Sequence, residues 1–289
     1  MINTLILTEK EGWHFQQLKN SLENKKHKVT SACLSDINLT IEKNKSNIFV
    51  NNSLLLDIDN VIVRFVPGGS LEEIVFYLNI LKILQSMNVK VINTASSIEC
   101  TVDKLFTSHL LNGNGIPTPM TYIYRGHDKA KEFIHKNNSF KEVVYKPLFG
   151  SQGDNIKLIN NVLDVDKLNN TSNIYYFQEY LENAINHDYR VLIIKNKENF
   201  KYFYMTRYGN TFVNNISKGG SCIKEDIDPA IINLAIESSK LLNIDFCGVD
   251  IMQYKKKYYV IEINSIPAWR GLQNVEEEII SDHFVDLLL

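Results

Sequence analysis

The chain has 289 residues and a hydrophobic content of 44%, which is enough for a large core and for two or more domains. Its 31 Lys and Arg residues nearly balance 33 Asp and Glu residues, which argues against a protein that coats nucleic acid or a membrane surface. The best apolar candidate for a membrane span, residues 74–84, is short and carries Asn79 and Lys82.

The N-terminal residues contain no basic leader, and their apolar run is too short for a signal peptide. The cysteines form no CxxC pair, so we expect reduced thiols in a cytoplasmic protein; they are Cys33, Cys100, Cys222 and Cys247. We therefore expect no membrane and no nucleic-acid partner.

Strand and helix patterns alternate over the first 95 residues. Apolar strands are expected at 3–9, 28–34, 60–67 and 89–94, with a helix-like stretch after the first. A second helix is expected at 70–87, where Ser70 and Glu73 have the spacing of a capping box. This alternation predicts parallel βαβ units, and hence a small open α/β domain over residues 1–98.

The remainder, residues 99–289, has the pattern of an α+β region with antiparallel strands. We expect one helix over 96–115, strands at 141–147 and 174–181, and a hairpin from 189–196 and 201–208. Asp228 and Pro229 suit the N-cap and first position of a later helix. FCGVDIMQY and KYYVIEIN form a last hairpin.

The last hairpin brings acidic side chains together. If its turn centres on Lys256, Asp250 lies directly opposite Glu262, and Glu262 shares a face with Val260 and Asn264. Two opposed carboxylates repel each other unless a cation lies between them, and hard oxygen ligands suit magnesium or manganese. The alternative is a pair of solvated acids on an open sheet face.

A small glycine-containing loop, together with two lysines elsewhere in the sequence, is a second candidate feature. The sequence has no GxxxxGK[ST] and no GxGxxG motif, but Lys146 ends an apolar strand just before a small flexible loop. Such a loop, here Gly150, Ser151, Gln152 and Gly153, allows backbone amides to approach phosphate oxygens. Lys104 lies in an otherwise apolar stretch of its helix. Alternatively, both lysines are surface residues and the loop is an ordinary hairpin turn.

The motifs occur in a characteristic order along the chain: DKLFTSHLLNGNGIPTP, VYKPLFGSQG, FQEYL, HDYR, NNISKGG, GVDI and IEINSIP. This order resembles the ATP-grasp superfamily, and within it the RimK-type ligases, from about residue 60 to 275. The resemblance implies a small N-terminal α/β domain followed by an ATP-grasp fold with a nucleotide-lid subdomain at about 99–180 and a metal-binding subdomain at about 181–289. It also implies ATP, two magnesium or manganese ions, and a homo-oligomer, either a dimer or a tetramer.

The resemblance assigns roles to residues that match the family motifs. Lys104 and Lys146 would bind the nucleotide phosphates, and the loop at 150–153 would close over them. Gln178 and the backbone of Glu179 and Leu181 would hold adenine, with Asp188 near the ribose. Asp250, Glu262 and Asn264 would be the metal ligands.

Further residues match positions that would contact the reacting groups. Arg207 would meet the transferred phosphate, and Arg190 would bind a substrate carboxylate or phosphate unless it forms a structural ion pair. Asn215 and Lys218 match an Asn-x-x-Arg-Gly-Gly motif, but lysine replaces the arginine, which keeps the charge and loses the bidentate fork.

The implied reaction is the ligation of an amino acid, commonly glutamate, to a carboxylate through an acyl phosphate. The tail SIPAWRGLQNV, with RFVPGGSLEE and INTASSIECTVDK, looks more like the branch that adds glutamate to tetrahydromethanopterin, which suggests a small-molecule carboxylate acceptor. Trp269 would then stack on a ring or, alternatively, pack the C-terminal turn. Arg270, or Arg64 with the helix start at 68–70, would hold an anion. The rivals are a ligase acting on a protein or peptide chain end, a non-catalytic ATP-binding regulator, and a plain α/β binding module.

Overall fold

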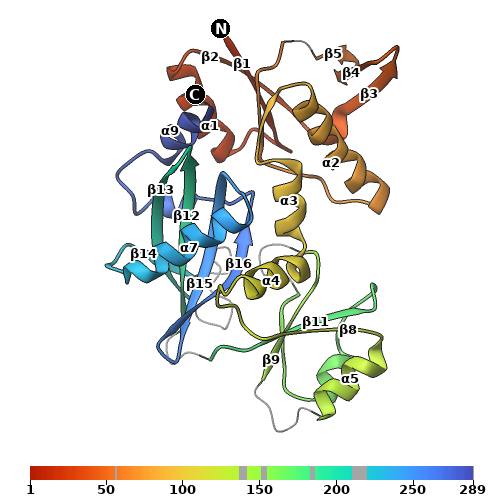
Figure 1. Ribbon diagram of the computed structural model, residues 1–289, viewed down its shortest axis with the longest axis vertical. Coiled ribbons are helices and arrows are strands. Elements are labelled where there is room, and N and C mark those ends of the chain that lie inside the picture. Colours follow the sequence, from red (N-terminus) through yellow and green to blue (C-terminus); the bar gives the residue numbers. More distant parts are fainter. Residues whose placement is uncertain (56, 137–141, 151–154, 183–185, 210–219, 289) are drawn as a thin grey trace.

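The computed structural model describes residues 1–55, 57–136, 142–150, 155–182, 186–209 and 220–288. In this part of the chain the strands form four sheets. In Figure 1 two of them, both N-terminal, lie at the top, and the sheet from residues 121–179, which we call the lid sheet, lies at the bottom. The C-terminal sheet lies on the left, between these levels. No helix within these ranges combines the length and apolar character that crossing a bilayer requires.

The N-terminal sheet is parallel throughout, with the order β2-β1-β6-β7, as the alternating pattern predicted. Its strands are β1 (Ile2–Leu7), β2 (His27–Ala32), β6 (Asn60–Val63) and β7 (Lys90–Ile92), and its helices are α1 (Trp13–Asn24) and α2 (Leu71–Ser86). The predicted capping box is present in α2: the Glu73 amide donates to Ser70 Oγ at 3.3 Å, and the Ser70 amide donates to Glu73 Oε2 at 2.7 Å.

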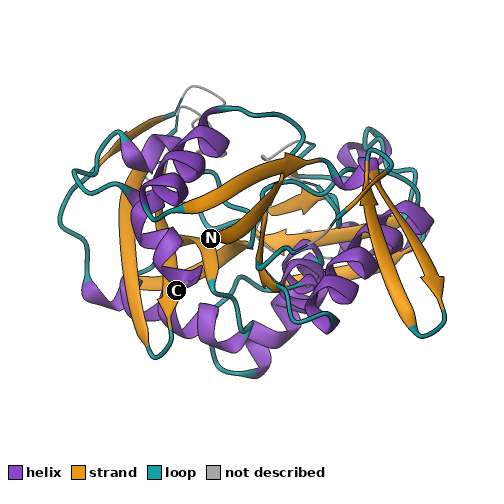
Figure 2. Ribbon diagram, turned by 90° about the horizontal axis from the view of Figure 1, so that it is seen from above, coloured by secondary structure: helices purple, strands orange, loops and turns teal. Residues whose placement is uncertain are grey.

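A small antiparallel sheet interrupts this domain and was not predicted from the sequence. After the short 3-10 helix Leu34–Asp36 come β3 (Ile37–Glu42), β4 (Lys45–Val50) and β5 (Ser53–Leu54). The turn residues Lys43 and Asn44 both have positive φ. Since neither is glycine, the turn carried no strong signal. Figures 1 and 2 show this hairpin at the margin of the molecule, on the side of α2.

The predicted helix over 96–115 is two helices, α3 (Ala95–Val102) and α4 (Lys104–Gly113). Asp103 has extended backbone angles and separates them, and its carboxylate accepts from the amides of Leu105 and Phe106, each at 3.0 Å. Aspartate favours such an N-cap over a position inside a helix. Lys104 is therefore the first residue of α4, next to the break. The proposed domain boundary at 98 and 99 lies inside α3.

The lid sheet has the order β10-β9-β11-β8 and is antiparallel. Its strands are β8 (Thr121–Arg125), β9 (Val143–Lys146), β10 (Lys157–Ile159) and β11 (Ile174–Glu179). Helices α5 (His127–Lys136) and α6 (Val162–Asp166) accompany it and were not predicted. An aromatic and aliphatic core that includes Phe133, Tyr145 and Phe177 joins α5 to the sheet.

The C-terminal sheet has the order β14-β13-β12-β15-β16. Its strands are β12 (His187–Asn196), β13 (Asn199–Tyr208), β14 (Ser221–Ile223), β15 (Phe246–Tyr254) and β16 (Lys257–Asn264), all antiparallel as expected. Helix α7 (Pro229–Leu241) packs on it and starts as predicted: Asp228 accepts from the Ala230 amide at 2.9 Å, with Pro229 as the first helical residue.

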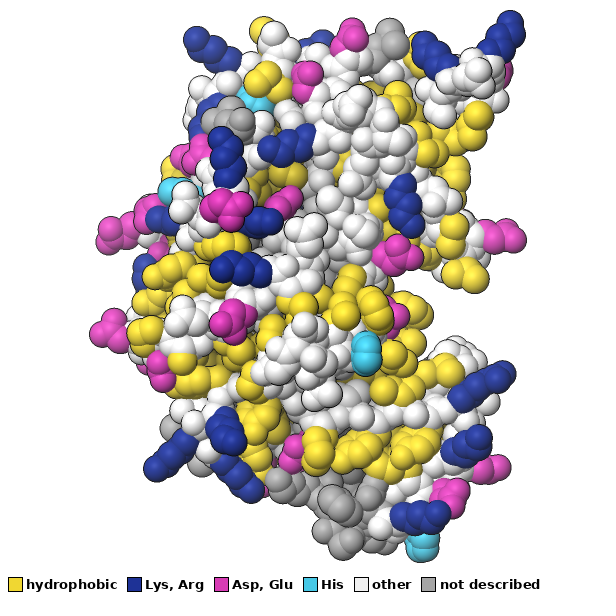
Figure 3. Space-filling view, viewed as in Figure 1, with side chains coloured by type: hydrophobic (Ala, Val, Ile, Leu, Met, Phe, Trp, Pro, Cys, Tyr) yellow, Lys and Arg dark blue, Asp and Glu magenta, His cyan; other side chains and the backbone are white. Residues whose placement is uncertain are grey.

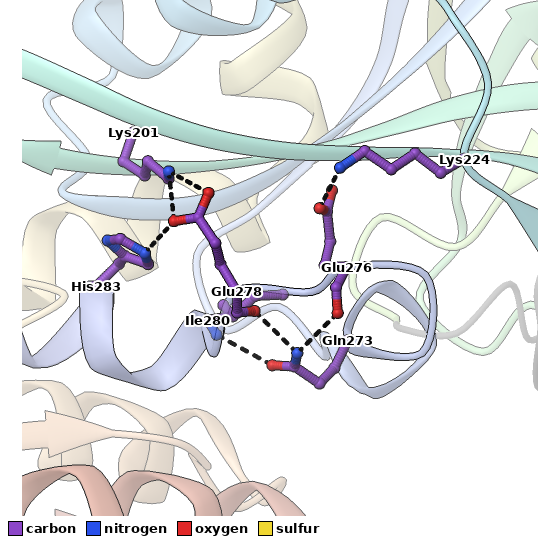
Figure 4. Close-up of polar contacts among 7 residues, drawn as sticks. All are labelled: Lys201, Lys224, Gln273, Glu276, Glu278, Ile280 and His283. Carbon is purple, nitrogen blue, oxygen red and sulfur yellow. Dashed lines mark hydrogen bonds and ion pairs between the residues drawn. The ribbon is translucent and has the colours of Figure 1, made fainter.

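The C-terminal segment returns to the N-terminal part of the chain. Helices α8 (Arg270–Gln273) and α9 (Ile280–Val285) precede a 3-10 turn at Asp286–Leu288, and α9 contacts α1 through a 2.8 Å hydrogen bond from Ser21 Oγ to Ser281 Oγ. Figure 4 shows the loop between α8 and α9 held to the sheet by Lys201 with Glu278 and by Lys224 with Glu276. These contacts connect the loop after α8 to β13 and to the residue that follows β14.

Candidate active site

A large cleft lies where the N-terminal, lid and C-terminal sheets meet. Its volume is about 1170 Å³, and its walls include α2, the α3–α4 break, β9, β11 and the ends of β12, β13, β15 and β16. Figure 3 shows the surface hollowed on this side, between the region of α2 above and the lid sheet below. A cleft of this size at a domain junction is the expected place for a binding site.

The last hairpin places the two predicted carboxylates opposite each other. Asp250 pairs with Glu262 across β15 and β16, as expected, but not through the expected turn. Lys255 and Lys256 both have positive φ and form a two-residue turn, and a bulge at Ile261 then restores the predicted pairing.

The bulge also changes which residues of β16 face the core. Val260 is fully buried and Ile263 is nearly so, and both lie in one core cluster, whereas Ile261 and Glu262 are only half-buried. The predicted alternation, with Ile261 and Ile263 on one face and Val260 and Glu262 on the other, was therefore wrong.

Four charged residues form a buried network at one end of the cleft, which we call the carboxylate end; they are Asp188, Arg190, Arg207 and Asp250. Arg190 donates to both oxygens of Asp250 through Nε and Nη2, the second at 2.7 Å. Arg207 donates to both oxygens of Asp188 at 2.6 and 2.9 Å, and its Nη2 lies 3.1 Å from Asp250 Oδ2. The network contains two cations and two carboxylates, so its charges balance within the protein.

Burial and neighbouring charges act in opposite directions on the two aspartates. Burial alone would raise the pKa of Asp250, but Arg190 and Arg207 outweigh it and hold that pKa below its usual value. Burial raises the pKa of Asp188 in spite of Arg207. Both oxygens of Asp188 contact Arg207, which favours a positioning role for this carboxylate over the expected contact with ribose.

Among the described residues, the lysines at the other end of the cleft donate hydrogen bonds only to neutral oxygen atoms. Lys146 ends β9 and donates to Gln178 Oε1 at 2.6 Å, and Lys104 donates to the carbonyls of Leu148 and Gly150 at 3.3 and 3.0 Å. Burial lowers the pKa of Lys146 to about 8 and also lowers that of Lys104, although Glu262 opposes both shifts. Neither lysine is an ordinary surface residue.

The adenine-binding prediction receives more limited geometric support. Gln178 is buried, with Nε2 donating to Tyr176 Oη at 3.2 Å and Thr121 Oγ1 at 3.3 Å, so its side chain orients Lys146. The Glu179 amide already donates to the Met120 carbonyl at 2.8 Å, so this amide is not available to a base. Leu181 is buried and lines the cleft.

Five of the predicted site residues lie outside the described residues, namely Ser151, Gln152, Gly153, Asn215 and Lys218. Of the proposed lid loop, the structure describes Gly150 alone.

The proposed metal ligands suit a magnesium site whose coordination is completed by substrate phosphates. Among the described residues, no group of three or more His, Cys, Asp and Glu side chains is arranged to hold a metal ion. Asp250, Glu262 and Asn264 provide two carboxylates and one amide along the cleft wall. Magnesium is commonly held by one or two carboxylates together with substrate phosphates and water, so this donor set suits it once a nucleotide is bound.

Trp269 and Arg270 do not lie where a substrate-binding pair was expected. Trp269 is 1% exposed and packs against Phe246 and His14, so it packs the C-terminal turn and cannot stack on a substrate ring. Arg270 is exposed, lies 6.0 Å from the centre of the Trp13 ring, and does not line the cleft. Of the two alternatives for Trp269, the structure therefore supports packing of the C-terminal turn.

Gly248 is a site residue whose role the sequence did not reveal. A β-carbon at this position would lie 3.1 Å from Pro267 Cβ and 3.2 Å from Arg190 Nη1. Any larger residue would therefore push Arg190 or the C-terminal turn away. A glycine inside a strand is the signal for such a close approach, and it was available in the GVDI motif.

Comparison with known families identifies this arrangement. The sequence model of the RimK-like ATP-grasp domain family matches residues 101–286, and the sequence model of the RimK pre-ATP-grasp domain family matches residues 2–98. The chain belongs to the RimK-like ATP-grasp family. It is an ATP-grasp ligase, and the regulator and the plain binding module are set aside.

Relatives in this family include named glutamate ligases. The chain is 28% identical to tetrahydromethanopterin:alpha-L-glutamate ligase of Methanococcus maripaludis, over 97% of this chain and 96% of that protein. It is 26% identical to coenzyme gamma-F420-2:alpha-L-glutamate ligase of the same organism, over 91% and 90%.

Solved structures show the same fold at low sequence identity. A RimK domain protein of Sphaerobacter thermophilus has a TM-score of 0.74 at 14% identity, with 99% of each chain covered. A peptide-associated ATP-grasp ligase of Chryseobacterium gregarium, in complex with ADP and a leader and core peptide, has a TM-score of 0.73 at 18% identity, over 100% of this chain and 96% of that one.

Proposed function

We propose that this ligase joins glutamate, or a similar amino acid, to a carboxylate of a small-molecule acceptor related to the pterin coenzymes. The observation that carries the proposal is the meeting of two partly buried lysines, an arginine pair and the Glu262 carboxylate in one large cleft. The names of the relatives support the choice of glutamate and of a coenzyme carboxylate.

The chemistry requires activation because a carboxylate is a poor acyl donor. An oxygen of the acceptor carboxylate attacks the γ-phosphorus of ATP, the bond to ADP breaks, and an acyl phosphate forms. The amine nitrogen of the amino acid then attacks the acyl carbon, phosphate leaves with its electron pair, and the nitrogen loses a proton. Such an enzyme contributes mainly by positioning the reactants and neutralising their charge.

The residues of this chain have separate tasks in the proposal. Lys104 and Lys146 hold phosphate oxygens, and Arg207, fixed by Asp188, faces the transferred phosphoryl group. Arg190 binds the carboxylate or phosphate of the intermediate. Asn215 and Lys218 remain predicted contributors.

Magnesium ions held by Asp250, Glu262 and Asn264 would neutralise the phosphate oxygens and stabilise the charge that develops on them. Glu262 is the better-placed carboxylate, because no side-chain hydrogen bond to it is found among the described residues, whereas Asp250 faces two arginines.

An assay of ADP release tests the proposal directly. It contains ATP, magnesium, glutamate and one of several acceptors: a pterin coenzyme, acidic peptides or free amino acids. The proposal expects release that depends on the pterin-type acceptor and on glutamate together. Stimulation by an acidic peptide instead would show a peptide-modifying ligase, and release without any acceptor would refute the acceptor assignment.

We also propose a homo-oligomer, either a dimer or a tetramer, which light scattering on the purified protein would test. A cytoplasmic location and the absence of a nucleic-acid partner remain predictions.

A further inference from the structure

Arg64 lies where the N-terminal sheet meets the C-terminal turn. It follows β6, and its amide donates to the Leu7 carbonyl at 2.8 Å. Its Nη2 donates to the Pro267 carbonyl at 2.8 Å, and its guanidinium carbon lies 4.6 Å from the centre of the Trp269 ring. Arg64 is partly exposed, and it lines the cleft. Its guanidinium is thus fixed at the cleft wall.

Arg64 has no acidic partner in the part of the chain that the structure describes. Of the five buried side-chain nitrogen and oxygen atoms without a hydrogen-bond partner there, three belong to this contact, namely Arg64 Nε, Arg64 Nη1 and Trp269 Nε1. Withdrawing a cation from water without an anionic partner costs several kcal/mol. Burial accordingly lowers the pKa of Arg64 to about 9, which still leaves the side chain charged at neutral pH.

The neighbours of Arg64 add no negative charge. His14 accepts a hydrogen bond from the Trp269 amide at 3.1 Å. Burial, followed by Arg64 and Arg270, lowers the pKa of His14 to about 4, so this ring is neutral at pH 7. The cluster therefore has surplus positive charge that the described residues do not compensate.

The other candidates for an anion site on this wall are already occupied or point elsewhere. At the start of α2, Glu73 accepts from both the amide and the hydroxyl of Ser70, at 2.7 and 2.8 Å, which places a carboxylate where an anion would bind. Arg270 lies outside the cleft, over Trp13. Arg64 is thus the better-placed anion-binding group of those that the sequence suggested for this wall.

Pro267 connects the surroundings of Arg64 with those of Arg190. Pro267 accepts the hydrogen bond from Arg64, and both Pro267 and Arg190 pack on Gly248. Arg190 uses Nε and Nη2 on Asp250, which leaves Nη1 without a hydrogen bond to any described residue. The two arginines therefore flank one proline on the wall of one cleft.

We propose that Arg64 binds a carboxylate of the incoming amino acid, so that the amine lies beside the acyl group held near Arg190. This inference rests on the proposed function and names the substrate subsite within it. The guanidinium charge is delocalised over its three nitrogens, so a carboxylate that contacts Nη2, the nitrogen outside the buried pair Nε and Nη1, offsets the charge of the whole group. Glutamate has two carboxylates besides its reacting amine, and an enzyme that selects it needs a cation for at least one of them.

Intrinsic fluorescence reports on this site specifically, because the chain contains two tryptophans and both belong to the cluster, with ring centres 6.3 Å apart. The experiment titrates L-glutamate into the protein with magnesium and ADP present, for the wild type, Arg64→Met, Arg64→Lys and Arg270→Met. Affinity for magnesium–ADP is measured in parallel, and thermal unfolding confirms that each variant is folded.

We expect saturable fluorescence changes in the wild type and in Arg270→Met with similar Kd values. Arg64→Met should weaken glutamate binding at least tenfold and leave the Kd for magnesium–ADP within twofold, and Arg64→Lys should fall between. If Arg64→Met does not fold, Arg64→Lys decides: it must weaken glutamate binding and spare the nucleotide.

The inference is overturned if glutamate causes no saturable change in the wild type, if the Arg64 variants bind glutamate as the wild type does, or if they weaken glutamate and nucleotide equally. The last result would show a purely structural contact. Failure of this inference can be distinguished from failure of the proposed function. If ADP release requires glutamate but substitutions of Arg64 have no effect, only the Arg64 subsite is refuted. Glutamate binding at Arg64 without acceptor-dependent ADP release refutes only the ligase reaction proposed above.

Discussion

The two ends of the cleft handle positive charge in different ways. At the carboxylate end, Arg190 and Arg207 are paired with Asp250 and Asp188. At the lid end, the hydrogen bonds of Lys146 and Lys104 to residues that the structure describes go only to an amide oxygen and backbone carbonyls. Buried cations paired with acids are held in place by the protein itself, whereas cations that face neutral oxygens gain most when an anion arrives. The difference separates groups that organise the site from groups that receive ATP.

Loss of a carboxylate from the paired end should have the largest effect on stability. Asp250→Asn leaves Arg190 buried without an anion, and removing one partner of a buried pair typically costs about 3–5 kcal/mol. Chemical denaturation should show a loss of that order, with Asp226→Asn, an exposed aspartate, as the matched control. A change under about 1 kcal/mol would mean that the network does not hold the site together.

Loss of the Glu262 carboxylate, which lies opposite Asp250, should lower activity without a comparable effect on stability. Glu262→Gln keeps the shape of the side chain and removes a proposed metal ligand, so ADP release should fall at least about 100-fold. The free energy of unfolding should fall by only about 1 kcal/mol, because Glu262 offsets the burial of Lys104 and Lys146 but receives no side-chain hydrogen bond from the described residues. Glu237→Gln, on the exposed face of α7, is the control. Full activity in Glu262→Gln would remove this residue from the site.

At the lid end, nucleotide affinity should depend on pH. The pKa of Lys146 is about 8, so this side chain is charged below pH 8 and loses its proton above it. Its charged fraction falls from a half at pH 8 to about a tenth at pH 9, so the Kd for magnesium–ADP should rise about fivefold. Calorimetry on Lys146→Arg should show a flatter profile, because arginine stays charged. Equal slopes in both proteins would assign the pH dependence to another group.

The smallest effect is expected far from the cleft, at the ion pairs of Figure 4. Lys201 and Glu278 are both exposed, and exposed pairs contribute about 0–1 kcal/mol. Lys201→Met should therefore leave ADP release unchanged and lower the free energy of unfolding by less than about 1 kcal/mol. A larger loss of activity would show that the C-terminal segment controls the cleft.

The sequence predicted those parts of the fold that depend on local patterns. The parallel N-terminal strands and the α7 cap at Asp228 follow from periodicity and capping rules. The predicted pairing of Asp250 with Glu262 is confirmed only because a bulge offsets a turn that differs from the expected one. It did not predict the bulge at Ile261, because the register of a hairpin depends on its turn, and Lys255 and Lys256 adopt positive φ without glycine.

The sequence was less informative about contacts between distant segments. Arg64 and Pro267 are about 200 positions apart, and Arg207 could not be paired with Asp188 before the strands were aligned. The resemblance placed Lys146 and Lys104 in the site, but their contacts with neutral oxygens come only from packing. Tertiary structure therefore decides which charges are paired and which are left for a ligand.

The most direct test of the account follows an oxygen atom. The acceptor carboxylate is labelled with oxygen-18 and incubated with ATP, magnesium, glutamate and the enzyme, and the released phosphate is analysed by mass spectrometry. Activation through an acyl phosphate predicts one labelled oxygen in each phosphate, because the acceptor oxygen leaves with the phosphoryl group. Unlabelled phosphate, or label in AMP, would contradict the proposed ligation.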